Sequence, residues 1–408
     1  MMIKKNQFKK FKKNIIDIIW VLFLKINQNL FSFIFLMILT RKVSQEYVGE
    51  FFIVLAAIGM ASIFTSPGAS GTIIQSTARG FFGTFRKLIP FRLIGGLIGS
   101  IAISIYALTF SEESILRNTL FIAALFFPFS NGLSIWEDYY SGLGNFKFIS
   151  IFKTIYFVLS YSIMIIVLIN YETSMFFLIS VMYSILAIIN IIISLRILNN
   201  TSSTLKAEPK SISYSIKTSL YLIVNLIGNH IDKFLILYFL SPESVAIYIV
   251  AERIPELLKK YTQAIRTTLI PKFAHHKRLT KDINLKINIF SIFFTIGTLI
   301  VIFLIIPWLL PIAFTNAYSE SIFYSQLLCG TIIIGQFATT KITFLTSNFY
   351  HSDLKTLTIV SNFIRITSSL ILIPLFGILG AIVSALLYRL STSLVTSVLI
   401  KKYDIKNK

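Results

Sequence analysis

The sequence is poor in charge, in acidic residues and in cysteine. Charged residues are only 13% of its 408 residues, roughly half of the share that is usual in a soluble protein. The single cysteine, Cys329, excludes an internal disulfide framework and argues against a thiolate metal site. The sequence shows no phosphate-binding loop, metal-ligand cluster or set of nucleophile and base. We therefore expect a protein that is not an enzyme and that uses no cofactor.

Apolar residues dominate instead. Hydrophobic side chains make up 55% of the chain, and the mean hydropathy is +0.78. The apolar segments are long enough to cross a bilayer as helices. The predicted fold class is an all-α polytopic membrane protein, with about twelve transmembrane helices in two six-helix halves around a central cavity. The predicted spans lie near 14–39, 47–71, 88–108, 117–136, 154–169, 174–195, 214–240, 245–270, 288–313, 322–345, 356–373 and 379–400.

A hydrophilic segment separates the first six spans from the last six. Its sequence, LNNTSSTLKAEPKS, has the composition of a loop. We predict an N-terminal six-helix lobe at 1–195, a cytoplasmic linker at 196–213 and a C-terminal six-helix lobe at 214–408.

Positive charge gathers on one side of the predicted spans. The net charge of +21 could indicate nucleic acid, but most of it falls in short loops that flank the membrane, so we expect no nucleic-acid partner. With the N-terminus in the cytoplasm, the cytoplasmic segments hold 24 Lys and Arg residues, whereas the opposite loops hold only Arg41 and Lys42. The positive-inside rule then predicts that both termini are cytoplasmic.

Two short hydrophilic links have similar sequences. SQEYVGEF at 44–51 and SPESVAIY at 241–248 are 197 residues apart, close to half of the chain, and share serine, glutamate and valine in register. Together with the equal numbers of spans, this match indicates a duplication. Parallel repeats are typical of transporters whose two halves rock around a central site.

Ionisable side chains interrupt the seventh and eighth predicted spans. Such groups are costly in a membrane, so they face a water-filled cavity or a partner within the bundle. Bases outnumber acids, which favours a positive cavity and an anionic cargo such as phosphate or pyrophosphate. The residues that we predict to line the cavity and bind the cargo are Lys25, Asn225, Asn229, Lys233, Arg253, Lys260, Arg266 and Arg365.

The carboxylates of the same two spans are candidates for coupling transport to an ion gradient. They are Asp232, Glu252 and Glu256, which could carry a proton or a cation. A simpler interpretation stays open, in which polar groups bond between helices and charges neutralise each other. Glu256 and Lys260, for example, have the i,i+4 spacing of a favourable pair.

Three further motifs concern the shape of the spans. Ser66–Gly71, with one proline and two glycines, predicts either a broken helix or a helix end at the cytoplasmic edge. Gly95, Gly96 and Gly99 predict close helix packing. The composition of residues 137–145 predicts a loop between helix ends, in which Glu137 and Asp138 are ordinary solvated charges.

Several segments resemble one membrane-protein family. HIDKFLILYFLSPESVAIYIVAERIPEL at 230–257 resembles the opening of the second half of polysaccharide repeat-unit flippases, with Asp232 followed by Ser241-Pro242, Tyr248 and Ala251. Three further segments resemble other parts of that family in the expected order. The matching link of the first half is SQEYVGEFFIVLA, the loop after the fourth span is YYSGLGNFKFISIFKTI, and the approach to the last span is PLFGILGAIVSALLYRL. Ala246 departs from it, because glycine is usual there. The resemblance covers nearly the whole chain.

The resemblance implies a flippase of the multidrug/oligosaccharidyl-lipid/polysaccharide superfamily in the bacterial inner membrane. Its cargo would be an undecaprenyl-pyrophosphate-linked oligosaccharide of O-antigen or a similar surface polysaccharide. Its partners would be this lipid-linked oligosaccharide, the bilayer, and polymerase and chain-length proteins. Two alternatives stay open: a multidrug cation antiporter of the same superfamily, whose cavity should be acidic, and a membrane component of polysaccharide assembly that transports nothing.

Overall fold

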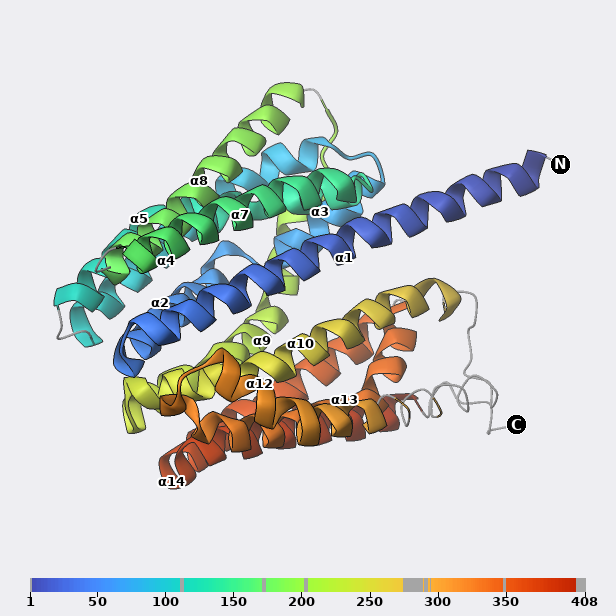
Figure 1. Ribbon diagram of the computed structural model, residues 1–408. Helices are drawn as coiled ribbons and strands as arrows, with labels where there is room; N and C mark the ends of the chain where they lie inside the picture. Colours follow the sequence, from blue (N-terminus) through green and yellow to red (C-terminus); the bar gives the residue numbers. More distant parts are fainter. Residues whose placement is uncertain are drawn as a thin grey trace. The chain divides into compact units, whose positions relative to one another are not determined.

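The computed structural model describes residues 2–110, 114–170, 174–201, 205–273, 289, 293, 295–347 and 350–400. Side chains are not described at 2–15, 110, 260–273, 337, 340, 347 and 351. Within the described ranges every regular element is a helix, as predicted (Figure 1). The α-helices are α1 (Met2–Lys42), α2 (Gln45–Ala61), α3 (Gly68–Ala78), α4 (Gly83–Phe110), α5 (Ser114–Ser130), α6 (Trp136–Gly142), α7 (Phe146–Asn170), α8 (Met175–Asn200), α9 (Ser211–Phe239), α10 (Pro242–Phe273), α12 (Ile306–Ala313), α13 (Glu320–Ser347) and α14 (His351–Ile400). Short 3-10 or π turns are η1 (Ser62–Thr65), η2 (Gly132–Ile135), η3 (Val301–Ile305) and η4 (Asn316–Tyr318).

The helices confirm an all-α polytopic membrane protein. Among the described residues, 9 helices are long and apolar enough to cross a bilayer. With α10, α13 and the second arm of α14, described below, they follow the twelve predicted spans in order. The segments between the predicted spans at 72–87 and 137–153 are expected to be loops, and this is wrong in extent, because α3, α4, α6 and α7 occupy most of both. Hydropathy marks only the apolar part of a helix, so polar helix ends read as loop.

The chain divides into two compact units, which do not coincide with the two halves of the sequence. Unit 1 comprises 1–42 and 54–223, and unit 2 comprises 43–53 and 224–408. Unit 2 therefore includes the start of α2, and the division also falls inside α9. The lobe and linker boundaries expected from the sequence stay a prediction.

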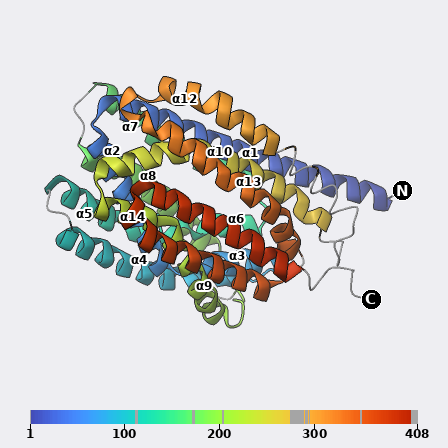
Figure 2. The ribbon, with the colours of Figure 1, turned by 90° about the horizontal axis from the view of Figure 1, so that it is seen from below.

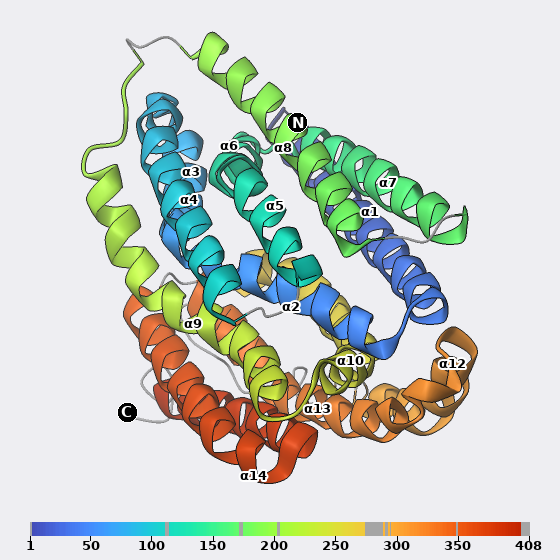
Figure 3. The ribbon, with the colours of Figure 1, turned by 90° about the vertical axis from the view of Figure 1, so that its left-hand side faces the viewer.

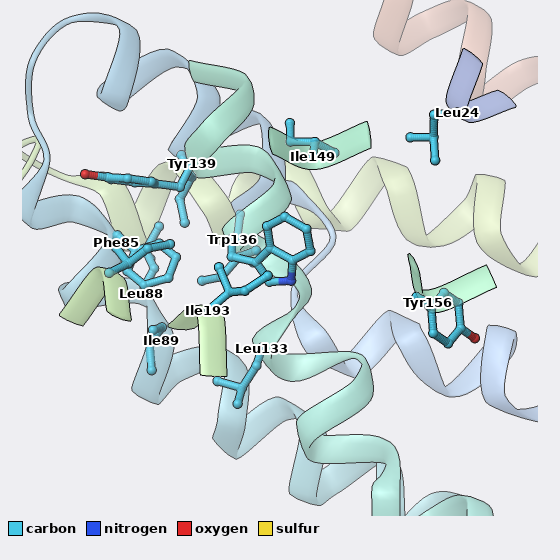
Figure 4. Packing of buried hydrophobic residues seen from close by; sticks show 14 of the residues in the cluster. Leu24, Phe85, Leu88, Ile89, Leu133, Trp136, Tyr139, Ile149, Tyr156 and Ile193 are labelled. Atoms are coloured by element: carbon cyan, nitrogen blue, oxygen red, sulfur yellow. The ribbon is translucent and has the colours of Figure 1, made fainter. Parts of the chain in front are cut away.

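In unit 1, α5 packs against α4 and α8, and α7 packs against α1 and α8 (Figure 3). The centre of its apolar cluster is Trp136, which is fully buried with Phe85, Leu88 and Tyr139 nearby (Figure 4). The rings of Phe85 and Tyr139 meet edge to face with centroids 5.2 Å apart. Lipid is as apolar as these side chains, so close contact and interhelical hydrogen bonds stabilise the unit more than removal from water does.

Glycines on α4 permit the close packing that the sequence predicts. A Cβ at Gly96 would lie 2.8 Å from Pro128 Cα of α5, and one at Gly95 would overlap the Phe64 carbonyl of η1. Only glycine leaves room for backbone at these distances.

The second span is a broken helix, not a helix that simply stops. Ser66 has a left-handed φ of 53° between η1 and α3. The break is held by α9: Ser219 Oγ lies 2.9 Å from Ser66 Oγ and accepts from the Gly68 amide at 3.0 Å. One turn earlier on α9, Ser215 Oγ donates to Thr72 Oγ1 of α3 at 2.9 Å. A neighbouring helix thus satisfies the backbone groups that the break leaves open.

The fourth span is also broken, at η2. Asn190 of α8 donates to the carbonyls of Phe129 and Ser130 and accepts from Trp136 Nε1 at 2.7 Å. On the other side Arg92 of α4, 4% exposed, donates to the carbonyls of Asn131 and Gly132. These two buried side chains cap the carbonyls that lose their helical partners.

The acids after this break differ from the prediction. Glu137 and Asp138 lie on α6 rather than in a loop, and both side chains are only partly exposed. Glu137 pairs with Lys153 of α7 at 2.8 Å. The acids are partly buried because the helix continues past η2 and packs against α3 and α7.

In unit 2, α13 lies beside α10 and α14 and also contacts α12 (Figure 2). α14 consists of two arms joined at Gly377, whose φ of 59° and ψ of −134° are not helical. Pro374 precedes this turn, and Gly380 packs so tightly against the backbone of Leu372 that a Cβ would overlap it. The arms correspond to the last two predicted spans.

The two similar links begin helices in the same way and meet within unit 2. Ser44 accepts from the Tyr47 amide at 3.2 Å, and Ser241 accepts from the Ser244 amide at 3.3 Å, as N-cap residues do. Gly49 lies against the backbone of Pro242, where a Cβ would overlap the proline carbonyl. The two links therefore have the same local structure, and the first packs on the second.

Candidate functional site

Among the described side chains of unit 2, the most buried charge is that of Asp232 of α9, which is 2% exposed. Its carboxylate accepts from Arg365 Nη2 and from Ser369 Oγ, each at 2.7 Å. Tyr248 of α10 approaches it at 3.5 Å. Arg365 and Ser369 are four residues apart on the first arm of α14, so they share a face and hold both carboxylate oxygens. Asp232 and Arg365 thus form a buried, neutral pair.

Two further ion pairs lie on α9 and α10. Lys233 pairs with Glu252 at 3.3 Å, and Arg253 pairs with Glu256 at 3.6 Å. Arg253 also lies over the ring of Phe52, near the start of α2, with its Cζ 5.0 Å from the centroid. Each of the three predicted coupling carboxylates therefore has a basic partner within this unit.

A third group of cations surrounds Tyr388 on the second arm of α14. The guanidinium carbons of Arg365 and Arg389 lie 5.5 Å and 5.2 Å from the ring centroid. Lys259 of α10 interacts electrostatically with Arg389 and Arg365. Lys259 also interacts electrostatically with Glu252 and Glu256. Among the side chains that the structure describes here, five cations therefore lie near three carboxylates.

The structure brings most of the predicted site residues together in unit 2. Asn229 accepts from Arg365 Nη1 at 3.4 Å, in a network with Asp232. Asn225 is half-buried one turn earlier on α9. Lys25 lies elsewhere, exposed on α1 in unit 1. The side chains of Lys260 and Arg266 lie outside the described part of the chain, so the predicted pair between Glu256 and Lys260 stays a prediction.

The sequence analysis missed Tyr248, Ser369, Tyr388 and Arg389 as members of this network. A signal existed for Ser369, which lies one helical turn after Arg365. The adjacent Tyr388 and Arg389 gave no such signal, because their neighbours come from α10 and the other arm of α14. Among the residues that the structure describes, no group of three His, Cys, Asp or Glu could hold a metal ion.

Solved structures of one superfamily match nearly the whole chain. The lipid II flippase MurJ in an inward closed conformation has a TM-score of 0.70 at 15% identity, covering 96% of this chain and 88% of that one. An inward-facing MATE multidrug resistance transporter has a TM-score of 0.66 at 14% identity, covering 93% and 96%. A MOP-superfamily transporter from Pyrococcus furiosus, described as having a binding pocket of reverse polarity, has a TM-score of 0.65 at 14% identity, covering 95% of each chain.

The fold is therefore that of the MOP-superfamily transporters. Residues 15–277 match the family described as polysaccharide biosynthesis protein. This match covers more than half of the chain, and the chain belongs to that family. No curated protein matches it. The family match and the shared fold confirm the resemblance to polysaccharide flippases of this superfamily, and the matched solved proteins are transporters and a flippase.

Proposed function

We propose that this protein moves undecaprenyl-pyrophosphate-linked oligosaccharide repeat units from the cytoplasmic to the outer leaflet of the bacterial inner membrane. The observation that supports this cargo is the excess of basic side chains in the described part of the unit 2 network, where five cations lie near three carboxylates. A pyrophosphate ester is an anion that guanidinium and ammonium groups bind well. A cation extruder would need the opposite charge. Membership in a family described as polysaccharide biosynthesis protein is consistent with a saccharide cargo.

The charged residues suggest how the cargo moves by alternating access. The anionic head group would exchange its water for Lys233, Arg253 and Arg365, while the lipid tail stays in the bilayer. Because these cations are already paired with carboxylates, the cargo would compete with Glu252, Glu256 and Asp232 for them. Protonation of a carboxylate would release its cation, which gives a route for ion coupling. Lys25, Asn225, Asn229, Lys260 and Arg266 remain further candidates for the lining.

Deletion of the gene tests the cargo. We expect lipid-linked oligosaccharide to accumulate on the cytoplasmic leaflet and surface polysaccharide to disappear. The wild-type gene should restore export, whereas Arg253→Ala should not. Lys355→Ala, which removes an exposed lysine of α14, is the matched control and should restore it. Unchanged lipid-linked pools and unchanged surface glycan would contradict the proposal and favour the multidrug antiporter.

Neutral isosteres of the three carboxylates test the coupling. Asp232→Asn, Glu252→Gln and Glu256→Gln, combined in one chain, should slow export and remove its dependence on the ion gradient. Export at the full rate in this triple variant would show that the carboxylates carry no coupling ion. Normal export in the Arg253→Ala variant would instead suit a structural component of polysaccharide assembly, or a partner of the polymerase and chain-length proteins.

A further inference from the structure

The helices α4, α5 and α8 of unit 1 present exposed apolar faces. α5 lies between the other two and contacts both (Figure 3). On each helix the exposed residues follow steps of three and four, so each set lies on one face. They are Ile94, Leu97, Ile101, Ile105 and Leu108 on α4, Phe121, Leu125 and Phe129 on α5, and Ile188, Ile192 and Leu195 on α8. In a membrane, faces of this kind lie against the acyl chains of lipids.

α5 ends before the ends of its two neighbours. A Cβ at Gly96 of α4 would lie 2.8 Å from Pro128 Cα of α5, and Asn190 of α8 donates to the carbonyl of Ser130 at 2.8 Å. These contacts place the last turn of α5 about three helical turns before the ends of α4 and α8. From there the chain turns through η2 into α6, which packs mainly against α3. Beyond this level the exposed surface consists of α4 and α8 without α5.

Three cations lie on that part of the surface. Arg86 and Lys87 are exposed near the start of α4, and Arg196 is exposed near the end of α8. Arg86 Nη2 donates to the carbonyl of Leu198 at 2.9 Å, so the two helix ends are joined directly. The positive-inside rule predicts that these ends are the cytoplasmic ones. The cations therefore lie at the level of the lipid head groups on that side.

The charges continue the apolar faces and are not neutralised. Lys87 and Ile94 have i,i+7 spacing and Ile192 and Arg196 have i,i+4 spacing, so each cation shares a face with the apolar residues of its helix. Among the residues that the structure describes, no carboxylate lies within ion-pair distance of Arg86, Lys87 or Arg196. Apolar faces accept any lipid tail, whereas Lys and Arg at their end select a negative head group.

We infer that the ends of α4 and α8 form a binding site for an anionic phospholipid. Arg86, Lys87 and Arg196 bind the phosphate of its head group, and its acyl chains lie along the exposed faces of α4, α5 and α8. The apolar faces assign the site to a lipid rather than to a free phosphate. The site lies in unit 1, and the inference does not depend on the proposed cargo.

Native mass spectrometry of the delipidated full chain tests the site. Phosphatidylglycerol and phosphatidylethanolamine with the same acyl chains are offered in equal amounts. We expect wild type to retain phosphatidylglycerol in preference. Lys87→Gln combined with Arg196→Gln should raise the Kd for phosphatidylglycerol by about tenfold or more, because two contacts to the anionic head group are lost. Arg86 is kept, since it also joins the two helices.

A second double variant controls for net charge. Lys217→Gln combined with Lys355→Gln removes the same charge from exposed positions on α9 and α14 and should leave the Kd unchanged. Equal weakening by the two double variants would show only a general attraction to a basic protein and would overturn the site. Equal retention of the two lipids by wild type would overturn it as well. If the first double variant does not fold, Lys87→Gln and Arg196→Gln are measured singly, and each should weaken binding.

Two competitors distinguish the possible occupants. Excess sn-glycerol 1-phosphate, which is the head-group phosphate without tails, should not displace the phospholipid, because the apolar faces contribute to binding. Displacement by this compound would identify a site for small anions and contradict a lipid site. Displacement by an equal concentration of undecaprenyl pyrophosphate would assign the surface to the cargo and would also overturn the inference.

Discussion

The pair of Asp232 and Arg365 shows what single residues contribute in the membrane-spanning part of unit 2. Asp232 has three partners from two helices, and its charge is matched by one guanidinium at 2.7 Å. Replacing the whole pair by neutral groups costs little in many proteins, whereas removing one member leaves a buried charge without a partner. For stability, it therefore matters more that neither residue of the pair is lost alone than that the pair is charged.

Arg365→Gln should lower the free energy of unfolding by about 3 kcal/mol, because it leaves Asp232 buried and charged. The double variant with Asp232→Asn should recover part of this loss. Thermal unfolding in detergent, followed by size-exclusion chromatography, ranks the variants. A double variant as unstable as the sum of the single ones would show that the two residues do not interact.

Two adjacent serines on α14 offer a matched comparison. Ser369 donates to Asp232, whereas Ser368 donates to the carbonyl of Arg365 in its own helix. Ser369→Ala should therefore lower the unfolding free energy by about 1.5–3 kcal/mol, the range for hydrogen bonds to charged groups. Ser368→Ala should have almost no effect in the same thermal assay. Equal effects of the two substitutions would contradict the assignment of Ser369 to the Asp232 site.

At the scale of elements, the breaks in the second and fourth spans depend on side chains from other helices. Ser219 supports the first break, and Asn190 and Arg92 support the second. In lipid an open carbonyl or amide has no water to bond, so each break is stable only with these partners.

Asn190→Ala should destabilise unit 1 by about 2–4 kcal/mol, because it leaves Trp136 Nε1 and two carbonyls unbonded. Asn170→Ala is the control, since Asn170 bonds only a carbonyl of its own helix at an exposed position. Thermal unfolding reports the change, and so does tryptophan fluorescence once Trp20 and Trp308 are replaced by phenylalanine. A stability equal to wild type would mean that the break needs no cap.

The contact between the two similar links can be tested in the same way. Gly49→Val should disrupt the packing of α2 on α10, because even a Cβ would overlap Pro242. We expect lower thermal stability and reduced export. Gly71→Ala, where a Cβ meets nothing within 4 Å, should be tolerated. Normal stability and export in Gly49→Val would show that the links separate without cost.

At the scale of the whole molecule, the prediction concerns orientation in the membrane. With Cys329 replaced by alanine, single cysteines can be placed at exposed positions. Lys355→Cys and Asn200→Cys should be protected from a membrane-impermeant maleimide in intact cells, whereas Thr109→Cys and Asn170→Cys should react. The physical reason is the retention of Lys and Arg on the cytoplasmic side. The reverse labelling pattern would contradict cytoplasmic termini.

The sequence by itself determined the class of the fold. Long apolar segments can be satisfied in lipid only as helices or closed barrels, and their length selects helices. It also predicted an interruption at Ser66–Gly71 and close packing at Gly95–Gly99, because proline and glycine act on the local backbone. Whether the interruption is a broken helix or a helix end was decided only by the contacts with α9.

Only the tertiary structure decided which charges meet. Asp232 and Arg365 are 133 residues apart, and nothing in helical periodicity specifies the pairing of their helices. The same holds for Arg389, whose neighbours depend on the turn at Gly377 and on the packing of α13 and α10. Local patterns act within a few residues along a helix, whereas a binding site in a helix bundle is assembled from side chains on several helices.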